Sequence, residues 1–257
     1  MRFIGRAVAP VLVLSLLTAC QGQVPVSQRT QPVNPLEVTL RYHAAVARQD
    51  GIAAAVLMDT SGSMSGSVTD FDGQSRPKIE IARRAAIDCV RQFEDYSRKN
   101  PDRKVLVGIY EFSARDKAQS CRQVVRLGLP DSAAATPAIN AMMPSGGTPI
   151  GNAMIQAKLE LDLTGMSRRH ILVITDGQNN RGYSPGDVAS ALSRIPEEER
   201  ASLYFIAFDT GADQFNAVKD AGGLVLAASS GGDLKQTLDF VLTGKILVEQ
   251  PVAPASR

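Results

Sequence analysis

The stretch VLMDTSGSMSGS, residues 56–67, joins an apolar run to an aspartate and a series of hydroxyl side chains. The run that leads into it, IAAAVLM at 52–58, is continuously apolar, which is typical of a strand buried on both faces of a parallel sheet. Asp59 follows at the carboxyl end of this strand, and Ser61 and Ser63 follow at alternate positions. Two interpretations compete: a flexible serine- and glycine-rich linker, or an oxygen-rich site for a hard cation.

Strand and helix patterns alternate along most of the chain. Strand-like runs occupy 52–58, 104–113, 121–129, 170–176, 202–209 and 223–228, and helical spacing occupies 78–99, 131–143, 149–163, 184–195, 212–222 and 233–242. This order predicts an α/β fold with a doubly wound, mostly parallel, Rossmann-like sheet and helices on both faces. The short polar turn before 121–129 predicts one antiparallel edge strand. Residues 36–42 also alternate, and an extra strand there is left open.

Two further loops would meet Asp59 at the carboxyl edge of such a sheet, where ligands bind. Asp176 ends a second buried run in ILVITDGQNN, and Thr148 precedes a helix in PSGGTPIGNA. The expected ligands are all oxygen donors, namely Asp59, Ser61, Ser63, Thr148 and Asp176. The only histidines are His43 and His170, and His170, at the start of its strand, is expected at the opposite end of the sheet from these ligands. An all-oxygen set with two carboxylates suits Mg²⁺ or Mn²⁺ better than zinc or copper.

The motifs DTSGSMS, SGGTPIGNA and ITDGQNN, in this order and on these elements, resemble the von Willebrand factor A domain with its metal-ion-dependent adhesion site. The resemblance covers about residues 50–243. It implies that Ser61 and Ser63 bind the metal directly, that Thr148 does so directly or through water, and that Asp59 and Asp176 act largely through water. It also implies that the open coordination position takes a carboxylate from a partner protein.

One segment departs from compact members of this family. Residues 66–77, GSVTDFDGQSRP, form a longer acidic loop before the first long helix. Asp70 and Asp72 are expected to lie in a solvated turn, with a part in partner choice or a second cation site as the alternatives, although the full calcium-loop spacing is absent. Arg181 and Tyr183 are expected to be ordinary exposed loop residues, with a partner surface as the alternative. Asp209 is given no metal role.

The first 19 residues predict a secretory signal, because a basic start precedes a short apolar run. The sequence LTAC at its end resembles the lipobox of bacterial lipoproteins, which implies a lipoprotein signal peptide, with an ordinary secretory signal and an incidental cysteine as the alternative. Cys20 is the expected lipidation site, which would anchor the protein to a membrane. Residues 20–49 are expected to be a flexible tether and 244–257 a disordered tail. The resemblance to bacterial lipoproteins implies the cell envelope, and the outer membrane where the cell has two.

The charge balance argues against nucleic acid as the main partner. The chain has 28 Lys and Arg and 26 Asp and Glu. Because Arg2 and Arg6 fall within the signal segment, the mature chain is expected to be near neutral. Nucleic-acid affinity depends on clustered positive charge, which this sequence lacks.

The two remaining cysteines leave their redox state open. Cys89 lies on the apolar side of a predicted helix, and Cys121 lies on a predicted strand. Export to an oxidising compartment permits a disulfide between them, and two buried free thiols fit equally well.

These features predict a membrane-anchored, metal-dependent protein-binding module and no enzyme. The first alternative is a scaffold lipoprotein of an envelope or secretion assembly in which the metal is structural. The second is a metal-dependent hydrolase with Asp59 as nucleophile. It is disfavoured because Ser61 stands where a phosphatase needs a second aspartate, and because the sequence has neither a G-x-S-x-G elbow nor a G-K-[ST] phosphate loop.

Overall fold

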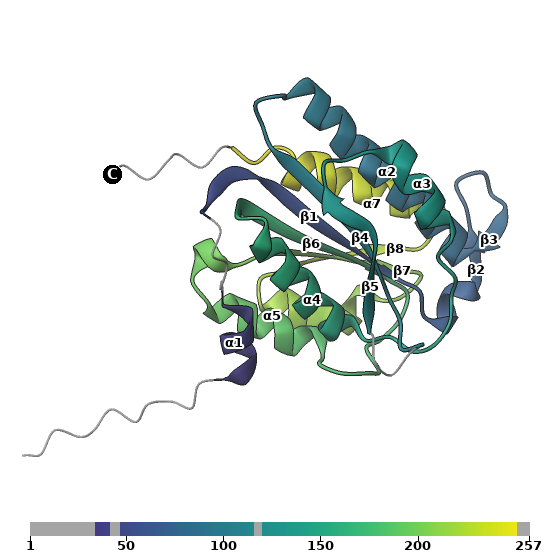
Figure 1. Ribbon diagram of the computed structural model, residues 1–257. Coiled ribbons are helices and arrows are strands. Elements are labelled where there is room, and N and C mark those ends of the chain that lie inside the picture. The colour runs from purple at the N-terminus through teal and green to yellow at the C-terminus, as the bar shows by residue number, and fades with distance from the viewer. Residues whose placement is uncertain (1–33, 42–46, 116–119, 251–257) are drawn as a thin grey trace, which may run out of the picture. The chain divides into compact units, whose positions relative to one another are not determined.

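A computed structural model describes residues 34–41, 47–115 and 120–250 of the 257-residue chain. Its centre is a six-stranded sheet in the order β5-β4-β1-β6-β7-β8 (Figure 1). The strands are β1 (Gln49–Asp59), β4 (Val105–Phe112), β5 (Cys121–Gly128), β6 (Met166–Thr175), β7 (Ser202–Phe208) and β8 (Leu224–Ala228). All neighbours are parallel except β5, which pairs antiparallel with β4 at one edge. This confirms the predicted fold class and its antiparallel edge strand.

Helices cover both faces of the sheet (Figure 1). One face carries α2 (Lys78–Lys99), α3 (Ser132–Asn140) and α7 (Gly231–Val241), followed by a π-helical turn at Leu242–Ile246. The other carries α1 (Pro35–Leu40), α4 (Ile150–Leu163), α5 (Pro185–Arg194) and α6 (Asn216–Asp220). Short 3-10 helices lie at Gly62–Ser65, Glu197–Glu199 and Ala212–Phe215, and a small hairpin pairs β2 (Ser67–Thr69) with β3 (Ser75–Pro77).

The continuous apolar runs form strands because both of their faces are covered. In β1 the side chains of Ala54, Val56 and Met58 belong to the core under α2, whereas Ala55 and Leu57 belong to the core under α4. Alternate residues of a strand point to opposite faces, so each central strand contributes to two separate hydrophobic cores. This packing fixes the strand ends, and with them the loops that carry the predicted ligands.

At the ends of the domain the structure decides one open question and corrects two expectations. Residues 35–40 form the helix α1 rather than a strand, with Asn34 accepting the Leu36 N–H as an N-cap and Pro35 at the first helical position. Leu36 and Leu40 are buried, so this part of the predicted tether packs on the domain. At the other end, 244–250 continue the ordered chain instead of beginning a tail. The signal segment and Cys20 lie outside the described residues.

The strand β6 also begins four residues earlier than predicted, at Met166. His170 therefore lies in the middle of this strand rather than at its start, and pairs with Ser202, the first residue of β7. It is buried well before the carboxyl end of β6, which supports the expectation that it lies away from the predicted ligands. None of the helices among the described residues is both long and apolar enough to span a membrane.

Candidate metal centre

Two aspartates lie side by side at the carboxyl ends of the central strands. Asp59 is the last residue of β1, and Asp176 directly follows β6. Because β1 and β6 are parallel neighbours in register from Ile52 to Met58, both carboxyl groups emerge at the same edge. The chain runs from β1 to β4 on one side and later to β6 on the other, so this is the point where the strand order reverses.

The two serines of the first loop lie between these carboxylates. The Ser61 N–H donates to Asp59 Oδ1 over 2.7 Å, which closes a tight turn after the strand. The Oγ atoms of Ser61 and Ser63 are 3.0 Å apart, and Ser63 Oγ donates to Asp176 Oδ1 over 2.6 Å. A continuous set of oxygen atoms thus runs from the β1 loop to the β6 loop.

The third loop brings Thr148 to the same place. The Gly62 N–H donates to Gly146 O over 3.0 Å, which ties this loop to the first one. The Thr148 N–H donates to Asn180 Oδ1 over 2.9 Å, which ties it to the loop after β6. A side-chain atom placed on Gly177 would be 3.8 Å from both Ser63 Oγ and Thr148 Oγ1, so the two hydroxyls border the same space. The structure therefore brings all five predicted ligand residues together.

Burial makes the charge of Asp59 costly in the metal-free protein. Its side chain is fully buried, and this desolvation raises the pKa of the carboxyl group to about 6. Hydrogen bonds from Ser61 and from Thr175 Oγ1, at 2.6 Å from Oδ2, work in the opposite direction, and the nearby Asp176 adds to the increase. A bound cation would supply the positive charge that the ionised form needs.

The donor chemistry fits Mg²⁺ or Mn²⁺. Two carboxylates and three hydroxyls converge, and the described residues contain no group of three or more His, Cys, Asp or Glu side chains that would suit another kind of metal centre. Hard divalent cations bind oxygen donors and keep part of their water shell, so two carboxylates with neutral hydroxyls can suffice.

Sequence reasoning missed Lys78 and gave Asp209 no role here. Lys78 begins α2, and its Nζ lies 2.9 Å from Asp176 Oδ2 and 2.7 Å from Asp209 Oδ2. Desolvation opposes the lysine's charge, but hydrogen bonds from Nζ to both carboxylates outweigh it and raise the pKa of Lys78. The available signal for Asp209 was its position, because it directly follows β7 as Asp176 directly follows β6. No sequence signal marks Lys78.

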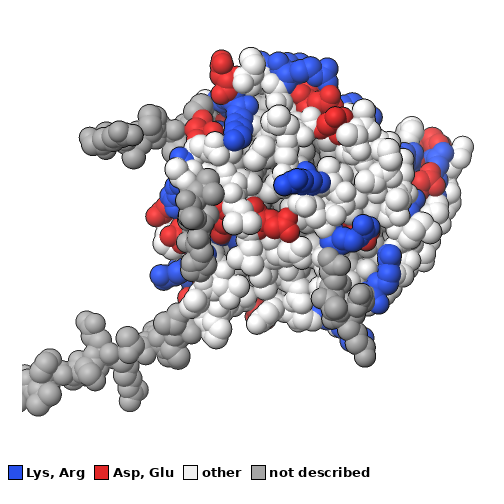
Figure 2. Space-filling view, viewed as in Figure 1, with Lys and Arg blue, Asp and Glu red and all other residues white. Residues whose placement is uncertain are grey.

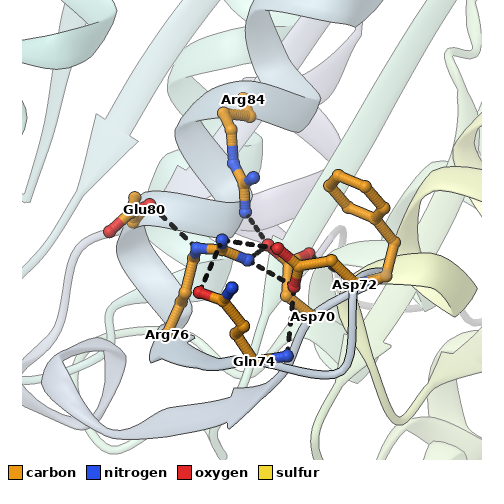
Figure 3. A network of polar contacts seen from close by, with 7 residues as sticks. Asp70, Asp72, Gln74, Arg76, Glu80 and Arg84 are labelled. Atoms are coloured by element: carbon orange, nitrogen blue, oxygen red, sulfur yellow. Dashed lines mark hydrogen bonds and ion pairs between the residues drawn. The ribbon is translucent and has the colours of Figure 1, made fainter.

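The acidic loop after the serine motif is a hairpin whose turn is exposed, as expected for Asp72, whereas Asp70 is buried against expectation. The Asp70 side chain is only 2% exposed and pairs with Arg76 and Arg84, while Asp72 accepts from both terminal nitrogens of Arg76 at 2.6 and 2.7 Å (Figure 3). The hydrogen bonds from Arg76 lower the pKa of Asp72 to about 2. Arginine thus holds both aspartates, which argues against a second cation site. Phe71 between them is 72% exposed.

Other predicted residues lie as follows. Arg181 and Tyr183 are exposed on the loop after Asp176, as expected.

Cys89 and Cys121 are buried free thiols, and they belong to the separate cores on opposite faces of the sheet. The disulfide option is therefore wrong, because the sheet separates the two sulfur atoms. On the face shown in Figure 2, basic and acidic side chains are interspersed.

Residues 54–178, which include all five predicted ligands, match the family model of the von Willebrand factor type A domain. None of the curated protein sequences matches the chain. The match and the observed fold together support a von Willebrand factor type A domain in this protein.

Solved structures show the same fold at low sequence identity. The PilB minor pilin from Streptococcus sanguinis is 12% identical, with a TM-score of 0.56 over 79% of this chain and 63% of the pilin chain. A von Willebrand factor type A protein from Catenulispora acidiphila is 19% identical, with a TM-score of 0.58 over 82% of this chain and 49% of that one. The pilus adhesin SpaC from Lactobacillus rhamnosus GG is 15% identical, with a TM-score of 0.57 over 79% and 32%. This chain thus spans less than two thirds of each of them.

Proposed function

We propose that this protein is a membrane-anchored, metal-dependent protein-binding module. Asp59, Ser61, Ser63, Thr148 and Asp176 would hold Mg²⁺ or Mn²⁺, and the metal would capture an acidic side chain of a partner protein. The observation that carries the proposal is the convergence of these oxygen donors from three loops at the switch point of the sheet. When bound, the metal would supply a positive charge that attracts a carboxylate from outside the domain.

Exposed apolar side chains flank the three ligand loops in the sequence and support a partner surface. Phe71 follows the first loop and is 72% exposed, Met143 precedes the second and is 61% exposed, and Tyr183 follows the third and is 52% exposed. Exposed aromatic side chains are enriched where proteins bind one another. The similarity in fold to a minor pilin and a pilus adhesin points the same way, toward an exported binding protein.

A hydrolase is less consistent with the geometry. The Asp59 carboxyl group is fully buried and both of its oxygens accept hydrogen bonds, from the Ser61 N–H and from Thr175 Oγ1. A nucleophile must reach the reacting atom of its substrate, and this carboxylate would first have to leave its partners. The scaffold alternative has one observation in its favour, because Lys78 already balances the charge of Asp176 without a metal.

Calorimetric titration of Mg²⁺ and Mn²⁺ into the mature chain with Cys20→Ser tests the metal part of the proposal. We expect saturable binding that Asp59→Ala abolishes, with Asp72→Ala as a matched acidic control that leaves it unchanged. A well-folded wild-type chain that binds neither ion would defeat the proposal and favour the scaffold.

The partner is sought by capture from envelope extract with and without chelator. We expect a protein that chelator releases, and weaker capture by Tyr183→Ala at unchanged metal affinity. Retention of the same protein by Asp59→Ala in excess chelator would count against the adhesion mechanism.

The lipid anchor has its own test. Cys20→Ser should move the full chain out of the membrane fraction, and persistent membrane association would refute the lipid anchor.

A further inference from the structure

Lys78 places a positive charge inside the candidate metal centre. Its Nζ contacts Asp176 Oδ2 at 2.9 Å and Asp209 Oδ2 at 2.7 Å, and its side chain is only 12% exposed. The other oxygen of Asp176 accepts the hydrogen bond from Ser63 Oγ. The fully buried carboxylate of Asp176 is therefore occupied by a hydroxyl on one side and by an ammonium group on the other.

The backbone fixes where this lysine side chain starts. The Lys78 N–H donates to Gly66 O over 2.7 Å, which closes the base of the β2–β3 hairpin just after the serine motif. A side-chain atom on Gly66 would be 3.6 Å from Lys78 Cε, so the lysine passes directly over this glycine toward Asp176. The hairpin insertion thus aims the first residue of α2 at the metal edge.

An ammonium group and a divalent cation repel each other when both contact one carboxylate, and the repulsion is strong where water is excluded. Whether the metal meets Asp176 directly or through water, its charge therefore favours withdrawal of Lys78 from that carboxylate. Asp209 offers a place for it, because its carboxylate already contacts the same Nζ and is 41% exposed. A lysine side chain has enough rotatable bonds to leave one of these carboxylates and keep the other.

The backbone of Asp209 adopts a conformation that is uncommon for a residue other than glycine. Its φ of 54° is the only positive value among the described residues other than glycine. This left-handed conformation is uncommon for residues with a side chain, and such strain gathers at functional sites. The Asp209 N–H donates to Ala228 O over 2.7 Å, which ties the end of β7 to β8.

We propose that Lys78 is an internal cation that competes with the metal for Asp176, and that Asp209 receives its ammonium group when the metal binds. The inference rests on the metal-binding function proposed above and adds its regulation: the chain sets its own metal affinity through a salt bridge that must open. In the metal-free protein the same ammonium group balances the buried carboxylate of Asp176.

The test is calorimetry of Mg²⁺ on the mature chain with Cys20→Ser, comparing wild type, Lys78→Met and Lys78→Arg. We expect Lys78→Met, which keeps the length and removes the charge, to bind at least tenfold more tightly. Lys78→Arg keeps the charge and should stay within about threefold of wild type. Thermal unfolding without metal provides a second readout, since Lys78→Met should lower the melting temperature and enlarge the increase that Mg²⁺ produces.

Asp209→Asn tests the second half of the proposal, first in a chain that keeps Lys78. We expect this variant to bind Mg²⁺ several-fold more weakly than wild type, because the lysine then has only Asp176. In the Lys78→Met background the same change should have no effect. An equal loss in both backgrounds would show a general charge effect and overturn the role of Asp209.

The outcomes separate this inference from the proposed function. Wild-type binding with unchanged or weaker affinity in Lys78→Met overturns the competition and leaves the metal site in place. Binding by Lys78→Met but not by wild type would show that the ammonium group blocks the site, and would overturn the metal-dependent function proposed for the wild-type chain. Absence of binding in both chains overturns the inference together with the metal site.

Discussion

Asp59 illustrates how one residue couples the stability of this domain to its ligand. The raised pKa means that the folded protein disfavours the ionised carboxylate. In the metal-free protein, the stability that Asp59 contributes is therefore fully present below about pH 4, its unfolded pKa, and is lost as the pH rises through about 6. A shift of this size corresponds to at most about 3 kcal/mol at neutral pH.

Asp59→Asn should remove this cost. In chelator at pH 7.5 we expect the variant to be more stable than wild type by up to about 3 kcal/mol, and the difference to vanish near pH 4. The Asn side chain can still accept the Ser61 N–H, and its amide can donate to the Thr175 hydroxyl. Urea unfolding of both chains across this pH range measures the difference. Parallel pH profiles for the two chains would contradict the assignment.

At the scale of elements, the β2–β3 hairpin is held by its buried aspartate. Asp70 accepts hydrogen bonds from Arg76, Arg84 and the Phe71 N–H, and it lies against the first turn of α7. A side-chain atom on Gly231 would be 2.2 Å from Asp70 Oδ1, so only glycine permits this close approach. The sequence predicted a solvated acidic loop because charge alone does not reveal which aspartate is covered.

Asp70→Asn should therefore destabilise the domain by about 1.5–3 kcal/mol, since hydrogen bonds to charged groups contribute on this order. Asp72→Asn is the matched control, because Asp72 pairs with the same Arg76 from a more exposed position and should cost much less. Chemical denaturation gives the two free energies, and hydrogen exchange of residues 67–77 reports the loosening of the hairpin. Equal losses in the two variants would show that burial of Asp70 is unimportant.

At the scale of the whole molecule, the sheet divides the interior into two cores. Cys89 belongs to the core under α2, and Cys121 belongs to the core on the other face. Burial raises the pKa of each thiol to about 12, so neither forms a reactive thiolate near neutral pH.

In the mature chain with Cys20→Ser, we expect two free thiols per molecule, which a thiol reagent reaches slowly in the native protein and fully in denaturant. The melting temperature should be the same with and without reductant. A denatured, unreduced chain without titratable thiols would show that the two cysteines can pair after all.

The sequence by itself determined the class of fold and the members of the candidate metal centre. Continuous apolar runs can be buried only between two helical layers, and parallel strands place the residues that follow them at one edge. Asp59 and Asp176 were therefore predictable from position alone. The helix at 35–40 was not, because six residues cannot distinguish alternation from helical spacing, and their packing on the domain decides the outcome.

Only the tertiary structure decided what surrounds these ligands. Lys78 and Asp209 are separated by 131 positions in the sequence, and the contacts of Lys78 with Asp176 and Asp209 exist because α2 begins at the edge of the sheet where β6 and β7 end. The burial of Asp70 and the separation of the two cysteines likewise depend on which surfaces are covered after folding. Local sequence determines which segments become strands and helices. The charges around a side chain and its burial are determined by distant segments that pack against it.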